Sequence, residues 1–269
     1  MADFAQERLK EGPRAERRPW NKEGWIAVAS LLLAWQIASM YLPPILFPPI
    51  EKVVTTFLKL AIEDDLIEVT GHTYLRIIVA LIFSFVISTS LGLLGGIYGA
   101  VDRAISPLVQ IKQGVPSLCW IIFSIIWFRD VEVRNAFIVV ISTLPSFYYL
   151  SRDGIRSIPS DLWEMVRAWR PSTRQIVGKL VIPAILPNLI TGLRLNIGAA
   201  ARVTVFAELL GGVSGVGYQL RVAEEQFRMA EVLAWAVVLV FWTLVIDKLL
   251  ELVETRLLRE RGRKETEHA

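Results

Sequence analysis

Few side chains of this chain are of a type and spacing that could do covalent chemistry. The two histidines, His72 and His268, and the one cysteine, Cys119, lack companions at the spacing of a metal site or of a nucleophile and its base. No G-x-x-x-x-G-K-[ST] sequence exists, because Gly178-Lys179 is followed by leucine and has no glycine-rich segment before it. We therefore expect no catalytic residue, metal or cofactor in this chain. If the protein takes part in an ATP-driven process, the ATP and its magnesium are expected on another subunit.

Three charged residues instead stand inside a long apolar segment, residues 184–209. Such a charge is a functional candidate, because an unpaired charge is costly in hydrocarbon. Arg202 could give an anionic solute a favourable field, or it could pair with another span or extend to the surface. Glu208 is six positions away, about 120° around a helix, so we do not expect these two to pair. The candidate residues of a solute path are Arg194, Arg202 and Glu208.

A second candidate site is the charged segment of residues 160–174, which lies between two apolar segments. Ser160 can cap a helix, and acidic residues in the first turn favour a helix start. Apolar residues on one face of this helix suit a groove on another protein, although an ordinary basic connector explains the segment equally well. The candidate contact residues are Asp161, Leu162, Glu164, Met165, Arg167, Ala168, Trp169, Arg170 and Ser172, with Val166 on the same face as the apolar ones.

Membrane-spanning helices have to position these residues. Hydrophobic residues make up 54% of the chain and the mean hydropathy is +0.47, which is rare in a soluble domain. Residues 77–101 contain no charge and are long enough to cross a bilayer as a helix. We predict an all-α, polytopic membrane protein with six spans, the third of which is interrupted at Lys112 and Pro116. The spans are residues 25–42, 75–99, 105–128, 135–151, 184–209 and 231–249.

The distribution of lysine and arginine predicts how the spans are oriented. If residues 1–24 and the tail 250–269 are cytoplasmic, the cytoplasmic segments hold 20 of the 29 lysines and arginines and the outer segments hold 6. This excess agrees with the positive-inside rule and with an even number of spans in the domain of residues 25–249. We therefore expect both termini in the cytoplasm, the lipid bilayer as a partner, and no nucleic acid.

Small residues recur at every fourth position of the second predicted span, at Ser84, Ser88, Gly92 and Gly96. A face of small residues lets two helix backbones approach closely. We expect this face to serve helix packing, within the subunit or between two subunits. The alternative is a narrow wall of a solute path.

The sequence also predicts the structure of two segments outside the spans. Residues 50–62 could form an amphipathic helix on the outer surface. Residues 211–220, GGVSGVGYQL, are too rich in glycine for a stable helix, so we expect an outer loop or a re-entrant turn there.

The segment around residues 160–198 resembles the permease subunits of binding-protein-dependent ABC importers. A cytoplasmic loop of that family carries the pattern E-A-A-x-x-x-G, followed after a spacer by a hydrophobic residue and proline. The matching residues are Glu164, Ile182-Pro183, Pro187 and Gly192 to Arg194. Met165, Val166 and Arg170 stand where the family has two alanines and the glycine. Residues 207–218, AELLGGVSGVGY, and the six-span layout are similar to the nitrate/sulfonate/taurine branch.

The resemblance implies a MetI-like, type I importer fold in the bacterial inner membrane. The helix at about 160–174 would be a coupling helix that contacts a cytoplasmic ATPase. Two ATPase subunits, a second and commonly identical permease subunit, and a periplasmic solute-binding protein are the implied partners. ATP binding would switch a cavity between inward-facing and outward-facing states. The implied cargo is a small anion such as a sulfonate, taurine or nitrate.

Two other classes of protein remain open from the residues alone. An ion-coupled secondary transporter would need acidic or histidine relays within its spans, and only Glu208 offers itself. A non-transporting membrane scaffold could use residues 160–174 to recruit a partner. Transport activity separates the scaffold from the permease.

Overall fold

Residues 22–63, 66–169 and 171–267 are described by the computed structural model, and every regular element in these ranges is helical. The all-α prediction is thereby confirmed. Of the predicted amino-terminal segment, residues 1–21 lie outside the described ranges. The helices are α2 (Lys22–Tyr41), α3 (Ile50–Glu63), α4 (Leu66–Ile97), α5 (Gly99–Gly114), α6 (Ser117–Trp127), α7 (Val131–Arg156), α8 (Ser160–Ala168), α9 (Thr173–Ile176), the π-helical turn η1 (Val177–Val181), α10 (Ile182–Gly211), α11 (Val216–Glu225) and α12 (Met229–Glu267).

Five helical segments in the described ranges are long and apolar enough to cross a membrane. They are α2, α4, α7, the residues Arg174–Gly211 that include α10, and Met229–Leu252 of α12. A sixth span results if α5 and α6 are counted as one, although the two helices are bent by 99°. The bend follows from Val115-Pro116, because proline lacks an N–H group and disfavours a helical conformation of the residue before it.

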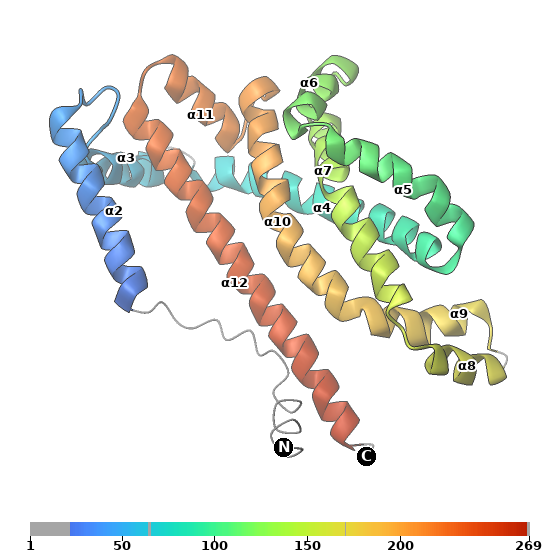
Figure 1. The fold of residues 1–269 in the computed structure, drawn as a ribbon. Coiled ribbons are helices and arrows are strands. Elements are labelled where there is room, and N and C mark those ends of the chain that lie inside the picture. The colour runs from blue at the N-terminus through green and yellow to red at the C-terminus, as the bar shows by residue number, and fades with distance from the viewer. Residues whose placement is uncertain (1–21, 64–65, 170, 268–269) are drawn as a thin grey trace.

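The centre of the bundle is built by α4, α7 and α10. In Figure 1, α4 passes behind α10 and α7, and it packs against both. Their shared core contains Ile77 and Leu81 of α4, Ile138 and Phe147 of α7, and Ala200 of α10. In contrast, α2 has no buried residue and touches the bundle chiefly through α3.

The amphipathic helix predicted at residues 50–62 is α3. Its residues Val53 and Leu60 are buried against Trp235 and Val238 of α12, so α3 covers one side of that helix. Figure 1 shows α3, α6 and α11 near one end of the bundle, which we call the α11 end, and α8 and α9 at the opposite end, the α8 end.

The small residues of α4, namely Ser84, Ser88, Gly92 and Gly96, lie along α7. The hydroxyl oxygens of Ser84 and Thr143 are 2.6 Å apart. A Cβ atom on Gly92 would lie 2.6 Å from the backbone oxygen of Tyr148, so the two helices could not approach so closely with a larger residue there.

The last helix, α12, is much longer than the predicted span of residues 231–249. It has 39 residues, which corresponds to a length of about 58 Å. Its apolar part ends at Leu252, and the helix continues through most of the predicted tail to Glu267.

Candidate functional site

The predicted coupling segment forms the short helix α8. It ends at Ala168 rather than near residue 174, because Pro171 disfavours a helical conformation of the residue before it. The next helix, α9, is capped by Ser172, whose backbone N–H donates to Oε1 of Gln175 at 2.9 Å. The backbone N–H of Gln175 donates in return to the hydroxyl of Ser172 at 3.4 Å, so Ser172 serves the start of α9.

Large apolar side chains of α8 and of the residue after it face solvent. Trp169 is 86% exposed and Met165 is 58% exposed, and Leu162 is exposed as well. We call these three residues the α8 patch. The other exposed candidates of this segment are Asp161, Glu164, Ala168 and Ser172. The side chain of Arg167 and the whole of Arg170 lie outside the described part of the structure.

Trp163 attaches α8 to the bundle, and the sequence analysis did not identify this residue. It packs against a cluster of buried residues from the end of α7, the connection that follows it, the turn η1 and the start of α10. The members of this cluster are Ile155, Ile158, Val181, Ile185 and Leu189. Trp163 directly follows Leu162, about 100° around the helix, so it could have indicated a second apolar side of α8. The helix thus has one apolar side that is anchored and one that is free.

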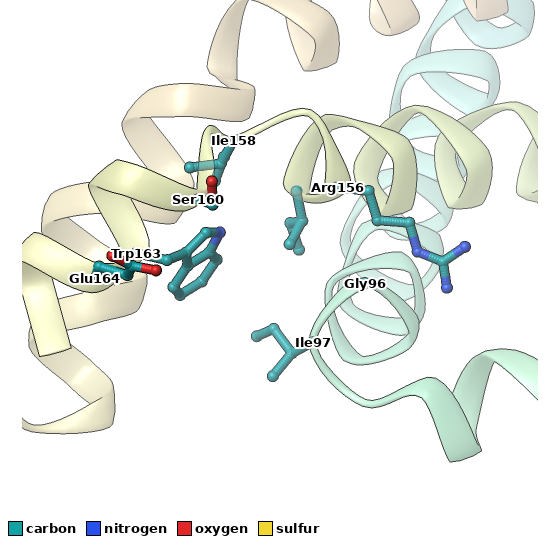
Figure 2. A pocket seen from close by; sticks show the side chains of 8 residues that line it. Gly96, Ile97, Arg156, Ile158, Ser160, Trp163 and Glu164 are labelled. Atoms are coloured by element: carbon teal, nitrogen blue, oxygen red, sulfur yellow. The ribbon is translucent and has the colours of Figure 1, made fainter.

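A cleft of about 610 Å³ separates α8 from the end of α4. Figure 2 shows Trp163 and Glu164 on one side of this cleft and Gly96 and Ile97 on the other, while the guanidinium of Arg156 is directed away from it. The cleft shows that α8 does not pack on α4. Its connection to the spans therefore runs through α7 and α10.

Close to this cleft, one carboxylate of α5 accepts three hydrogen bonds from α7. Asp102 accepts from the Tyr148 hydroxyl at 2.7 Å, from Nη1 of Arg152 at 3.2 Å and from Nη2 of Arg156 at 2.7 Å. The three donors are four residues apart and so share one helix face. We call these four residues the Asp102 cluster. No short sequence pattern could have predicted this cluster, because Asp102 precedes its donors by 46 to 54 residues.

At the α11 end, Glu208 is fully buried and paired within the subunit. Its carboxylate accepts from the Thr73 hydroxyl, from Nη1 of Arg76 and from the Gly217 backbone N–H, each at 3.0 Å. Arg76 also donates from Nε to Glu132 of α7 at 2.8 Å. These five residues form the Glu208 cluster. The Glu208 carboxylate has no exposed surface and so contacts no solute in this structure. It serves instead as one partner of an ion pair with Arg76, which joins α10 to α4.

The glycine-rich segment, residues 211–220, is only partly a loop, because α11 begins at Val216. The expectation that this segment is too rich in glycine for a helix was wrong for residues 216–220, since the start of α11 is stabilised from outside the segment. The Val216 N–H donates to the Thr73 hydroxyl at 2.9 Å, and the Gly217 N–H donates to Glu208. These two donors would otherwise lack partners at a helix start. Gly215 has φ of 102°, a conformation that favours glycine.

Arg194 is paired with two acidic residues of α12. Its Nε donates to Oδ1 of Asp247 at 2.8 Å, and its Nη2 donates to Oε2 of Glu251 at 3.2 Å. The pairing ties α10 to α12 in the half of the bundle nearer to α8. Arg194 therefore has a structural partner that its place in the sequence did not reveal.

Arg202 has a different environment from the other two intramembrane charges. It lines a cavity of about 490 Å³ between α10, α11 and α12, and it forms no hydrogen bond or ion pair with any residue that the structure describes. Most of the lining is apolar, and Thr243 is its other polar residue. The apolar lining includes Val205, Phe206, Leu209, Leu220, Leu239, Val240 and Leu244.

The described ranges contain no group of three His, Cys, Asp or Glu side chains that could hold a metal ion. The carboxylates Asp102 and Glu208 are each occupied by several donors of the chain itself. The described part of the chain therefore offers an exposed protein-binding patch, the unpaired guanidinium of Arg202 in α10, and two clusters that connect helices.

Residues 88–259 match the family described as "Binding-protein-dependent transport system inner membrane component". One relative is the putative aliphatic sulfonates transport permease protein SsuC of Bacillus subtilis, which is 28% identical over 262 residues, 95% of this chain and 93% of the relative. Another is the taurine transport system permease protein TauC of Escherichia coli, 22% identical over 267 residues, 96% of this chain and 97% of the relative.

The fold is also similar to that of a solved structure, the MetNI methionine ABC transporter in an inward-facing conformation. The similarity has a TM-score of 0.62 and covers 72% of this chain and 95% of that chain, at 19% identity. It agrees with the MetI-like arrangement of spans that the sequence analysis predicted.

Proposed function

Because the chain belongs to the family of binding-protein-dependent transport system inner membrane components, we propose that it forms half of the membrane path of an ATP-driven importer for a small anion. A second, identical copy would form the other half. Two cytoplasmic ATPase subunits would bind ATP and magnesium, and a periplasmic protein would deliver the solute. Both termini and α8 would lie in the cytoplasm, as the 20 lysines and arginines of all the predicted cytoplasmic segments favour.

The α8 patch is the observation that carries this proposal. Exposed tryptophan and methionine side chains on a short helix are the type of residue that anchors a helix in a groove of a partner. Trp163 fixes the same helix to α7 and α10. An ATPase that held the patch would therefore displace two spans together with α8, which is what alternating access requires.

Replacing Trp169 by alanine is expected to weaken ATPase binding about thirtyfold, the effect of losing a typical interface hot spot. The measurement is the amount of ATPase that copurifies with the tagged protein from native membranes in mild detergent. Glu164→Ala, at the rim of the patch, is expected to act in the same direction. The matched control is Trp127→Ala in α6, which removes an equally large exposed side chain at the α11 end.

Two results would contradict the coupling role of α8. One is the absence of any ATPase beside the wild-type protein. The other is equal ATPase recovery with Trp169→Ala and with the Trp127→Ala control. Gel filtration of each variant shows that a loss of ATPase does not reflect a misfolded permease.

Arg202 supports the assignment of an anionic solute. Arg202 is exposed and, among the described residues, unpaired at the edge of an apolar cavity, and a guanidinium in such apolar surroundings attracts an anion because few other groups are there to neutralise it. Two carboxylates of the last spans, Glu208 and Asp247, already have the arginine partners Arg76 and Arg194. An identical second copy would have the same pairs, so neither carboxylate is free to neutralise Arg202. The names of the relatives refer to sulfonates and taurine, which are sulfonate anions or contain one.

Arg202→Gln is expected to reduce anion uptake about tenfold or more, the usual effect of losing a charge-assisted hydrogen bond. Arg202→Lys keeps the positive charge and is expected to retain most of the uptake. The measurement is ATP-dependent uptake of a labelled sulfonate into proteoliposomes that contain the permease, its ATPase and its binding protein. Unchanged uptake by Arg202→Gln would remove this residue from the path.

The same assay separates the importer from an ion-coupled transporter. The importer takes up solute only with ATP and is unaffected when a proton or sodium gradient is abolished. Uptake without ATP that ceases on adding an ionophore would overturn the proposal.

A further inference from the structure

We infer that Asp102 is a positioning residue that makes the broken span, α5 and α6, follow the movements of α8. This inference rests on the proposed function and deepens it. The Asp102 contact would carry a displacement of α8 by the ATPase to the broken span, to which α8 is not directly joined.

The first step is that Trp163 packs α8 against the buried cluster where α7 ends and α10 begins. Only residues 157–159 separate the two helices. Ile155 and Ile158 pack with Trp163 of α8 and with Ile185 of α10. A force on the α8 patch therefore displaces the last turns of α7, since close-packed side chains move together.

The second step is that Asp102 is the main polar link between α5 and α7, while α5 otherwise lies against α4, which it follows after Tyr98. Val109 is its one buried residue in the described structure. The Lys112 ammonium reaches the backbone oxygen of Ser142 only at 3.5 Å. In contrast, Asp102 accepts three hydrogen bonds from α7. The bonds from Tyr148 and Arg156 are each 2.7 Å long, and Arg156 is the last residue of α7.

The third step concerns the opposite end of α5. There the chain turns through 99° at Val115-Pro116 before α6 begins. A proline at such a break removes a helical hydrogen bond and lets the two segments change their relative angle. With its first turns tied to α7 through Asp102 and its other end at a bend, α5 would pivot at Tyr98, where it joins α4, whenever the end of α7 moves.

The packing of α4 supports the specific geometry of the Asp102 cluster. A Cβ atom on Gly95 would lie 2.8 Å from the Tyr148 hydroxyl oxygen, so glycine is needed for this hydroxyl to occupy its place. The same hydroxyl donates to Asp102. Arg152 is further held over the ring of Tyr149, with its guanidinium carbon 4.6 Å from the ring centroid. The donors are thus oriented toward Asp102 by their own surroundings.

The test measures solute transported per ATP hydrolysed in proteoliposomes that contain the permease, its ATPase and its binding protein. Asp102→Asn is expected to lower this ratio about tenfold, within the range typical of coupling between sites. ATPase copurification and ATP hydrolysis are expected to remain. Asp102→Glu keeps the charge and is expected to restore part of the ratio. The matched control is Asp153→Asn, an exposed carboxylate that pairs with the same Arg152 at 2.8 Å.

A second measurement follows the movement itself. In a Cys119→Ser background, spin labels at Arg103→Cys and Asp153→Cys report the distance between α5 and α7. With Asp102 present, this distance is expected to be the same without nucleotide and with ATP. With Asp102→Asn it is expected to change on ATP binding. Arg156→Gln, which removes only one donor of the three, is expected to show the same change to a smaller extent.

Two results would overturn the inference while leaving the importer intact. They are an unchanged ratio in Asp102→Asn and a distance that changes on ATP binding although Asp102 is present. If no ATPase accompanies the wild-type protein, the proposed function fails, and the inference fails with it.

Discussion

Glu208→Ala is expected to lower the free energy of unfolding by about 3–5 kcal/mol, the usual effect of removing one partner of a buried ion pair. The substitution leaves the guanidinium of Arg76 without its buried carboxylate. It also leaves the Thr73 hydroxyl and the Gly217 N–H without their acceptor. The measurement is the unfolding of the purified protein in mixed micelles as denaturing detergent is added.

Glu132→Ala is the matched control for this prediction. It removes the other carboxylate that pairs with Arg76, at 2.8 Å, but the Glu132 side chain is 60% exposed. Only Arg76 of this pair is largely buried, and water screens the exposed Glu132 carboxylate, so a loss of at most about 1 kcal/mol is expected. Equal losses in the two variants would show that burial of the Glu208 carboxylate adds nothing to stability.

Gly92→Ala is expected to destabilise the protein, although alanine is the better helix former. The added Cβ atom would lie 2.6 Å from the Tyr148 backbone oxygen and 2.7 Å from Cβ of Ser151. A backbone oxygen cannot rotate away, so α4 and α7 have to separate. Overpacking costs about 1–3 kcal/mol and the gain in helix propensity is about 1 kcal/mol or less, so a net loss is expected.

Gly71→Ala on the same helix should have the opposite sign. No atom lies within 4 Å of the position of its Cβ, so only the gain in helix propensity remains, about 0.5–1 kcal/mol. Unfolding curves of both variants in the same detergent test the pair. A stabilised Gly92→Ala would mean that α4 and α7 are not in close contact at this position.

The helices could be predicted from local patterns in the sequence. Long apolar stretches predicted the spans, and one proline, Pro116, marked the bend between α5 and α6. The amphipathic pattern of residues 50–62 identified α3. These predictions were correct because each feature depends only on neighbouring residues within a few turns of the same helix.

The partners of the charged residues could not be predicted in this way. Glu208 meets Thr73 across 135 positions, and Asp102 meets Arg156 across 54. Such pairs have no fixed spacing, because they depend on how distant helices pack. The start of α11 was missed for the same reason, since two of its N–H groups are satisfied by Thr73 and Glu208 rather than by the segment itself.

The bonding of α11 to distant helices also has a consequence for the order of assembly. The acceptors of the Val216 and Gly217 N–H groups come from α4, early in the chain, and from α10. Until α4 and α10 have met, the beginning of α11 lacks these acceptors and its glycines favour an open chain. During synthesis, α11 is thus among the last helices to form, and an insertion intermediate that stops before residue 216 would expose the Glu208 carboxylate without its backbone donor.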